Sequence, residues 1–308
     1  MVPLFWKFGY AKLCGELTVI VGLDEDNKLI LDSNIDLELS SSKFLMTLQI
    51  NGQVVDSPGR ATFGGVWNRT IGELDMELMN NFYQKFLTKF GSKTIKIHLP
   101  PAYFHPGIFE AQHKIIVEKG GQILYSDTSF HVDLVTWTPM SMSAGNRKKL
   151  RQCRSQLVRT TQLSSKEIEI VYELIRVNRM SLGVEPSISI SELRRAFETF
   201  PEAYQCFGTF LGEKLIASAV TVLLSDDIRY VYMWADDAVY RGISPVVALC
   251  EGIIIDSKKL GLRIVDLGTA SQKGELNEGL ARFKQNLGAI STQKISYVFE
   301  DFVTGDVC

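Results

Sequence analysis

The carboxyl-terminal half of the chain alternates between β-rich and amphipathic segments, and this alternation constrains the fold more than any other feature of the sequence. Between Leu215 and Phe299, short runs rich in β-branched and aromatic residues are separated by two longer stretches with apolar residues at helical spacing. Strands that alternate with helices of this length form a sheet with helices on its faces. We therefore predict strands over 215–224, 229–235, 263–267 and 290–299, and helices over 244–260 and 275–287.

The rest of the chain continues the mixed pattern. Asn51-Gly52 is a strong hairpin signal, and the helix predicted over Glu73–Phe90 ends at Gly91. A loop or short helix is expected after Pro100-Pro101. The fold class is therefore α/β, with a mixed α+β sheet. Further helices are expected over 144–157, 166–182 and 190–200, and further strands over 17–23, 29–32, 35–39, 44–50, 94–99 and 203–211 and near 122–125 and 129–134.

Two distant segments of the sequence are similar to each other. Phe86–Leu99 and Asp256–Gly268 each end a predicted helix, turn at a glycine and enter a predicted strand. This similarity favours a duplicated α/β unit, although any two helix-to-strand units share it. A stretch rich in Ser, Thr, Pro and Met lies between Thr138 and Ser143, and we predict a domain boundary there. The expected domains are residues 1–140 and 141–308.

Composition limits the class of protein. The 308 residues carry a formal net charge of −2, which argues against attraction of the whole molecule to nucleic acid. Five scattered cysteines fit a reducing compartment and not a disulfide framework. The first residues do not read as a signal peptide, and no apolar run reaches the roughly 18 residues of a transmembrane helix. We expect a cytoplasmic protein with no membrane span, of unknown oligomeric state.

The histidines are the only clustered candidates for a metal site. All four, His98, His105, His113 and His131, fall within one window. Their spacings match no known ligand pattern, and no cysteine lies near them. We expect no metal.

Four segments in the second half occur in an order that resembles a known family. They are the basic opening Asn146–Gln156, the loop and helix Tyr240–Gly261, the strand end Val265–Thr269 and the helix Gly279–Ala289. Together they resemble the FemAB-like branch of the GNAT acyltransferases. This branch includes the FemX-type peptidoglycan aminoacyltransferases and the BioF2-like acetyltransferase domain. The turn Arg60–Gly65 also resembles the first half of some members.

The resemblance implies two tandem GNAT-like domains and an acyltransferase activity, with a link to the cell wall. The reaction would move an acyl or aminoacyl group from an activated donor onto the amine of a small molecule or peptide. It implies no tightly bound cofactor, with acyl-CoA or aminoacyl-tRNA as the co-substrate and tRNA therefore a possible partner. Arg60 would contact the substrate. The alternative is a non-catalytic binding protein that retains the GNAT fold.

Phe283-Lys284 carries the strongest catalytic expectation. On the predicted helix, Phe283 belongs to the apolar face and Lys284 lies at its border. A lysine there can meet a phosphate or the oxyanion that develops in acyl transfer, and the resemblance associates it with a phosphate-bearing substrate. The alternative is a lysine whose stem covers apolar surface near a helix end. We assign Lys284 to catalysis and Phe283 to substrate binding.

Asp266 and Gly268 end a strand at the centre of the second half. The carboxyl ends of strands are where open α/β sheets bind ligands. Asp266 can orient an amine or assist proton removal, and Gly268 would contact the substrate. Equally, the aspartate can cap the loop that follows.

Three aromatic residues alternate along the strand predicted over 229–235. Tyr230, Tyr232 and Trp234 should share one face, which can line a groove or pack into the core. GNAT enzymes use a tyrosine as general acid towards a leaving thiolate. The resemblance therefore makes Tyr232 a catalytic candidate, with Tyr230 and Trp234 in substrate binding.

Two basic segments are candidate phosphate sites. Arg241-Gly242 precedes a helix amino terminus, where free N–H groups attract anions. This loop departs from the pyrophosphate loop of acetyl-CoA-using GNAT enzymes, since it has one glycine and Pro245 removes a donor. Arg147 and Lys148 open a basic helix that can meet tRNA or a phosphorylated substrate, although such a run is more often a solvated face.

Overall fold

The computed structural model describes residues 18–23, 26–32, 43–59, 62–68 and 74–300. The chain forms two compact units. Unit 1 comprises residues 1–128, 271–275 and 292–308, and unit 2 comprises residues 129–270 and 276–291. The strand expected over 35–39 and the candidate Arg60 lie outside the described residues.

The strands of unit 1 form a mixed sheet in the order β2-β1-β3-β4-β6-β15. Strand β5 pairs with residues 44–46 of β3, which do not pair with β4. Neighbouring strands are antiparallel except β4 and β6, which are parallel. The strands are β1 (Thr18–Leu23), β2 (Leu29–Asp32), β3 (Phe44–Asn51), β4 (Val54–Ser57), β5 (Val66–Asn68), β6 (Thr94–His98) and β15 (Ile290–Phe299).

Two α-helices pack on the sheet of unit 1, α2 (Met76–Phe90) and α3 (Pro106–Glu118). Helix α2 begins where the Asp75 side chain accepts a hydrogen bond of 2.9 Å from the Leu78 amide. Its aromatic face, including Phe82 and Phe86, is fully buried with the apolar residues of β6. The short 3₁₀ turn η3 (Ala102–Phe104) precedes α3.

The strands of unit 2 continue the same mixed sheet, in the order β7-β12-β11-β10-β9-β8 after β15. All neighbours are antiparallel except β11 and β12. A separate two-stranded ribbon joins β13 (Ser271–Gln272) to β14 (Glu275–Leu276). The strands of the main sheet are β7 (Gln122–Asp133), β8 (Arg159–Leu163), β9 (Tyr204–Leu211), β10 (Lys214–Leu223), β11 (Ile228–Asp236) and β12 (Ile264–Thr269).

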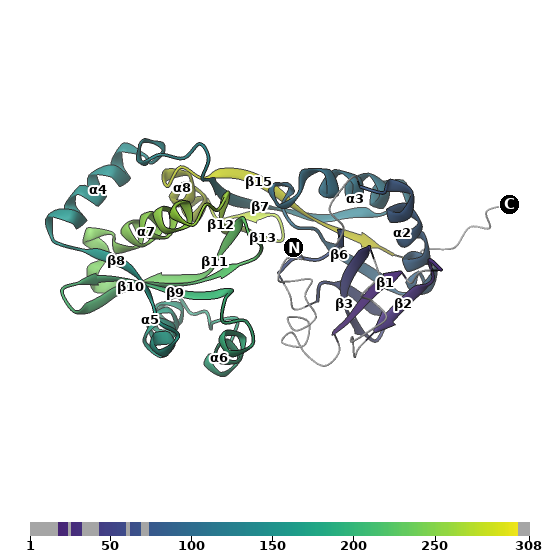
Figure 1. Ribbon diagram of the computed structural model, residues 1–308, viewed down its shortest axis with the longest axis horizontal. Coiled ribbons are helices and arrows are strands. Elements are labelled where there is room, and N and C mark those ends of the chain that lie inside the picture. Colours follow the sequence, from purple (N-terminus) through teal and green to yellow (C-terminus); the bar gives the residue numbers. More distant parts are fainter. Residues whose placement is uncertain (1–17, 24–25, 33–42, 60–61, 69–73, 301–308) are drawn as a thin grey trace. The chain divides into compact units, whose positions relative to one another are not determined.

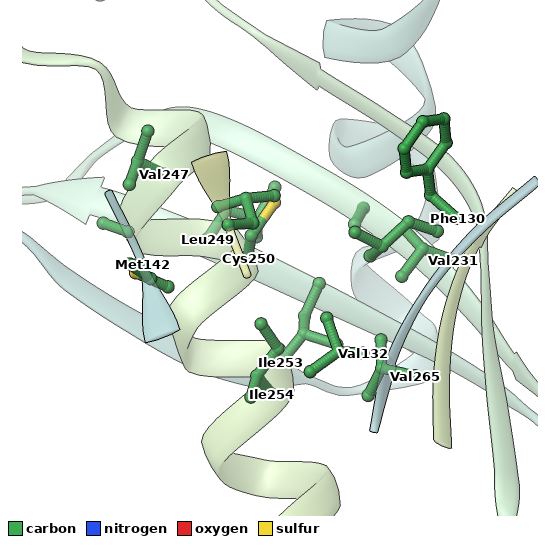
Figure 2. Packing of buried hydrophobic residues seen from close by; sticks show 14 of the residues in the cluster. Phe130, Val132, Met142, Val231, Val247, Leu249, Cys250, Ile253, Ile254 and Val265 are labelled. Atoms are coloured by element: carbon green, nitrogen blue, oxygen red, sulfur yellow. The ribbon is translucent and has the colours of Figure 1, made fainter. Parts of the chain in front are cut away.

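Helices cover both faces of the unit 2 sheet. Helices α7 and α8 lie on one side of the sheet and α5 and α6 on the other (Figure 1). Ile253 and Ile254 of α7 pack towards Val132 of β7 and Val265 of β12 in the main core (Figure 2). The helices are α4 (Ala144–Ser155), α5 (Ile168–Ser181), α6 (Ile190–Thr199), α7 (Pro245–Lys259) and α8 (Glu278–Asn286), with 3₁₀ turns η4 (Pro139–Ser141), η5 (Ser165–Glu167) and η6 (Ala238–Ile243).

The two units repeat one order of elements. In unit 1 the antiparallel pair β3–β4 leads through α2 to the parallel strand β6, and in unit 2 the pair β10–β11 leads through α7 to the parallel strand β12. The similar segments of the sequence are the helix-to-strand steps of these two crossovers. A parallel neighbour requires such a crossover, so the repeat extends beyond a shared local turn.

The compact units differ from the expected division into residues 1–140 and 141–308. Strand β7 begins in unit 1 and its residues 129–133 pair with β12 in unit 2. Strand β15 begins in unit 2 and its residues 296–299 pair with β6 in unit 1. The part of β7 that belongs to unit 2 therefore follows the helices of unit 1 in the sequence. In the same way, the part of β15 that belongs to unit 1 follows the helices of unit 2.

Some elements also differ from their sequence expectations. The two strands expected near 122–125 and 129–134 form the single strand β7, and the loop or short helix after Pro101 includes the 13-residue helix α3. Strand β8 was not expected, because Arg159–Leu163 is mostly polar and exposed and lacks the apolar alternation of a half-buried strand.

A fully buried arginine of β11 forms hydrogen bonds with residues of α7 and β9. Arg229 is 0% exposed and donates to Asp256 at 2.7 Å, to Ser257 at 2.9 Å and to Gln205 at 2.6 Å. Its guanidinium lies 5.1 Å from the centre of the Phe207 ring. Burial lowers its pKa, while Asp256 raises it. The charge is therefore tolerated only because a carboxylate lies beside it.

We expect Asp256→Ala to lower the free energy of unfolding by ~3 kcal/mol, because it leaves the buried Arg229 charge without its partner. The double variant Arg229→Met/Asp256→Ala should recover part of this loss. Urea unfolding followed by circular dichroism measures both. Arg263→Ala is the matched control, because the Arg263–Asp227 pair is 40% and 45% exposed and should contribute at most about 1 kcal/mol. Equal losses for Asp256→Ala and Arg263→Ala would contradict the prediction.

Candidate functional site

The parallel strands β11 and β12 separate at their carboxyl ends. Their pairing runs from Ile228 opposite Ile264 to Tyr230 opposite Asp266 and stops there. Beyond this point β11 continues beside β10, and β12 continues to Thr269 beside β7. Both strands are irregular at the separation, with register shifts against their outer neighbours. Carboxyl ends of parallel strands and β-bulges are both common at ligand sites.

Gly268 and Asp266 shape the end of β12. Gly268 has a φ of +74°, a left-handed conformation that other residues adopt only with strain. Its amide donates to the Asp266 carboxylate at 2.7 Å. Through this hydrogen bond the fully buried aspartate caps the turn that follows it, in agreement with the alternative role given to this residue.

Lys284 is buried at the same strand end. Its side chain is 2% exposed, and Nζ donates to the carbonyl oxygens of Gly268 at 2.9 Å and Thr269 at 2.7 Å. Phe130 and Trp234 lie about the ammonium, with ring centres 5.9 and 6.0 Å from Nζ. Burial lowers the pKa of Lys284 to about 8, opposed by the negative charge of Asp266 and, less strongly, by Cys250.

The burial of Lys284 differs from the sequence expectation, which put it at the border of an apolar face. Helix α8 begins at Glu278, with the Asn277 side chain as its cap. Its buried residues are Ala281 and Lys284, whereas Leu276 lies before the helix and is 49% exposed. The helix therefore turns a charged residue, rather than a continuous apolar face, towards the strand ends.

The three aromatic residues of β11 do not share one face, contrary to expectation. Trp234 lies opposite Ala219 of β10, whereas Tyr230 lies opposite Val222. These two positions of β10 fall on opposite faces because they are three positions apart in the strand. The shift comes from an extra residue in β11, Tyr232, which has no directly opposite partner in β10.

The bulge therefore divides the aromatic residues between two settings. Trp234 packs edge-on against Phe283, with ring centres 5.6 Å apart, on the side of Lys284. Tyr230 lies with Tyr232, at 6.1 Å between ring centres. Burial raises the pKa of Tyr230, and the neighbouring Asp266 raises it further.

A histidine that sequence reasoning did not assign to the site lies in the same row. Tyr230, Asp266 and His131 occupy directly opposite positions on the adjacent strands β11, β12 and β7. Directly opposite residues share a face of the sheet. Burial lowers the pKa of His131 to about 4, so the imidazole is neutral at pH 7. Only the strand register reveals this neighbour, because His131 and Asp266 are far apart in the sequence.

The Arg241-Gly242 loop is engaged with its own chain. Arg241 Nε lies 3.2 Å from the Asp236 carboxylate. Asp237 accepts from the Val239 amide at 3.0 Å, and Pro245 occupies the first turn of α7. The expected anion site is therefore not preformed in this conformation.

Some cations of the basic helix α4 bond to other groups of the chain, and others are exposed. Arg147 donates to the main-chain oxygens of Met140 and Met142. Arg154 pairs with Glu251 at 2.7 Å. Lys148 and its neighbours Lys149 and Arg151 are exposed.

The fold thus brings together Lys284, Asp266, Gly268, Phe283 and Trp234, with Tyr230 and Tyr232 next to them. Among the described residues, Lys284 forms no hydrogen bond with the other candidates Arg241, Gly242, Arg147 and Lys148.

Two general findings bear on the site. Within residues 18–300, apart from the segments left undescribed, no three histidine, cysteine or acidic side chains are grouped as metal ligands would be. No helix in the described part of the chain combines the length and apolar character needed to cross a bilayer.

No protein-family model and no curated protein matches the sequence significantly. Solved structures do match, over both units. FemX aligns with a TM-score of 0.67 at 10% identity, covering 96% of this chain and 92% of FemX. The C-terminal domain of a putative lysylphosphatidylglycerol synthetase from Agrobacterium fabrum aligns with a TM-score of 0.60 at 11% identity, covering 96% and 88%. L-PGS from Bacillus licheniformis aligns with a TM-score of 0.59 at 13% identity, covering 93% and 85%.

These matches agree with the arrangement of the two units and their crossovers. At this level of identity they establish the architecture and not the reaction. The chain therefore has the fold of FemX and of these two synthetase structures, as the resemblance in the sequence predicted.

Proposed function

We propose that this protein is an N-acyltransferase that moves an acyl or aminoacyl group from an activated donor onto a substrate amine. The observation that carries the proposal is the buried ammonium of Lys284 at the separated ends of β11 and β12. Burying a charge is unfavourable, and a buried cation with a lowered pKa at a strand end marks a candidate functional site. The repeated order of elements also supports one GNAT-like domain in each unit.

Lys284 would stabilise the negative charge of the transition state. An ammonium has three N–H donors, and two of them are taken by the carbonyl oxygens of Gly268 and Thr269. The third remains for a substrate oxygen that enters between the strand ends. A cation in a desolvated site stabilises an oxyanion far more strongly than one in water. Direct attack by the amine requires no covalent enzyme intermediate.

The neighbouring residues would hold and deprotonate the substrates. Asp266 would orient the amine and accept its proton through its carboxylate, and Tyr232 would protonate the leaving group. The Trp234–Phe283 pair would contact the acyl group, with Tyr230 and Gly268 on the other side of the strand end. Positioning of two substrates is the main contribution expected from such a site.

Aminoacyl-tRNA is the donor that the described surface supports better. The three exposed cations Lys148, Lys149 and Arg151 of α4 are available to phosphates, and α4 contains no acidic residue. An acyl-CoA pyrophosphate would need the Arg241-Gly242 loop, where Arg241 is paired with Asp236.

We expect aminoacyl-tRNA to raise the melting temperature of the protein and acetyl-CoA to leave it unchanged, because a ligand that binds the folded state stabilises it. Differential scanning fluorimetry against both donors measures the shift. The variant Lys148→Glu/Arg151→Glu should lose the shift, and Lys89→Glu, a charge reversal on α2, should retain it. A shift with acetyl-CoA alone would instead favour the acyl-CoA donor.

Lys284→Met should lower the rate of amide formation about 10²-fold or more, because it removes the cation while keeping the apolar stem. The stabilising donor is incubated with a panel of amines, including lysine, ethanolamine and a peptide with a free amino terminus, and the amide is measured by mass spectrometry. Lys258→Met, which removes a cation that bonds only the Trp137 carbonyl, is the control. Donor binding without any amide product would favour the non-catalytic binding protein.

The pKa of Lys284 also predicts how stability depends on pH. Its pKa is about 8 in the folded protein and 10.5 in a model compound, so between these values the unfolded chain binds more protons. Stability therefore rises with pH across this window, by up to about 3 kcal/mol. The unfolding free energy of the wild type minus that of Lys284→Met should become more positive from pH 8 to pH 10.5 in urea titrations. A constant difference would show that Lys284 titrates normally.

A further inference from the structure

The described part of unit 2 ends in an open strand edge. Strand β8 pairs with β9 through five consecutive residue pairs, and no described strand pairs with its other side. Alternate residues of such a strand direct their N–H and C=O groups outward. Many proteins protect an edge with proline, a bulge or charged side chains. Strand β8, Arg-Thr-Thr-Gln-Leu, has no proline, its pairing is free of bulges, and its one charged residue, Arg159, stands at its start.

A cavity lies beside this edge on each face of the sheet. The first, of about 490 Å³, is lined by Thr160 and Gln162 of β8 together with α4 and α7, and we call it the α7-side cavity. The second, of about 440 Å³, is lined by Arg159 and Leu163 with Phe210, and we call it the α5-side cavity. Thr161 borders both. Residues of β8 thus alternate between two cavities that open along one edge.

The edge is held firmly in place. A Cβ on Gly252 of α7 would lie 2.4 Å from the methyl group of Thr160, so helix and strand approach as closely as glycine permits. The Thr160 hydroxyl donates to the Ala248 carbonyl at 3.1 Å and bonds Thr209 at 2.8 Å. A rigid edge binds a new strand without first losing conformational freedom.

We propose that β8 is a docking edge for an extended acidic peptide, which joins the sheet as an additional strand. In this mode main-chain hydrogen bonds supply affinity, and pockets for alternate side chains supply specificity. One set of peptide side chains enters the α7-side cavity and the other set enters the α5-side cavity. This docking edge is separate from the transfer site at β11 and β12, since β9 and β10 lie between them.

The charges around the α7-side cavity select acidic side chains. Its two carboxylates are already neutralised, Glu251 by Arg154 at 2.7 Å and Asp256 by the buried Arg229 at 2.7 Å. Lys259 is exposed at its rim, and the adjoining α4 carries basic residues and no acidic ones. The surplus charge is therefore positive.

The α5-side cavity suits apolar side chains of the peptide better than acidic ones, because Glu167 and Glu213 in its lining repel a further carboxylate. Leu163 and Phe210 lie in its lining, and the Arg159 side chain lies at the same edge as Glu167 and Glu213. The preferred peptide therefore alternates acidic and apolar residues, with the acidic residues facing α4.

A second copy of the chain suits this edge less well. Antiparallel pairing of two β8 strands about a two-fold axis would place the same face of both sheets on one side. The two α4 helices, each with five Arg or Lys residues and no acidic residue, would then lie on that side near the joint and repel each other.

The test uses three capped synthetic heptapeptides and the full chain. The first alternates Glu with Val and Leu, the second has Lys in place of Glu, and the third is the first with alternate amides N-methylated. We expect only the first to bind, with both others at least 10-fold weaker in fluorescence anisotropy. Hydrogen exchange should show new protection of amides in β8. Lys259→Glu should weaken the first peptide at least 5-fold, and Lys89→Glu on α2 should not change it.

Other outcomes would overturn the proposal. These are failure of the acidic peptide to bind, equal binding of the N-methylated peptide, or protection outside β8. Binding of an oligouridylate to Lys259 and α4 without peptide binding would assign the surface to nucleic acid. A dimer in analytical ultracentrifugation that excludes the peptide would assign it to a second copy. Circular dichroism of each variant ensures that a lost signal does not reflect unfolding, and the transfer assay provides an independent readout.

Discussion

The short parallel pairing of β11 with β12 is the constraint on which unit 2 depends. Parallel neighbours cannot be joined by a tight turn, so the chain between them crosses the sheet as α7, whose apolar face forms the main core. The pairing stops at Tyr230 and Asp266. After it the strands diverge, and the carbonyl groups at the end of β12 meet Lys284 of α8. The helix that covers the sheet and the opening at the strand ends therefore have one topological origin.

Two buried cations in unit 2, Arg229 and Lys284, differ in how the fold compensates their charge. Arg229 has a carboxylate and two further oxygen partners within 3 Å, so its charge is compensated by the fold. Lys284 has two neutral carbonyl groups and two aromatic rings, and its pKa falls to about 8. Neutral dipoles compensate a buried charge less completely than a carboxylate does. This incomplete compensation is why we propose Lys284, and not Arg229, as the cation that meets a substrate.

The course of β7 and β15 explains why the sequence division and the compact units differ. A composition change near residue 140 marks a change in local segments, but a unit is defined by which strands pair. Residues 129–133 complete the sheet of unit 2, and residues 296–299 complete the sheet of unit 1. Either unit expressed from a cut at residue 140 would lack one strand of its sheet.

The sequence by itself determined the α/β class, most helices and strands, and the repeated helix-to-strand step, because hydrophobic period and glycine stops are local properties. It also singled out Lys284, Asp266 and Gly268 as one neighbourhood, since the family resemblance and strand-end position both point there. Tertiary structure alone decided the burial of Lys284, the opposite faces of Tyr230 and Trp234, and the place of His131. The burial depends on how α8 packs on the end of β12, the two faces depend on a bulge, and the place of His131 depends on the register between distant strands. None of these leaves a signal in local spacing.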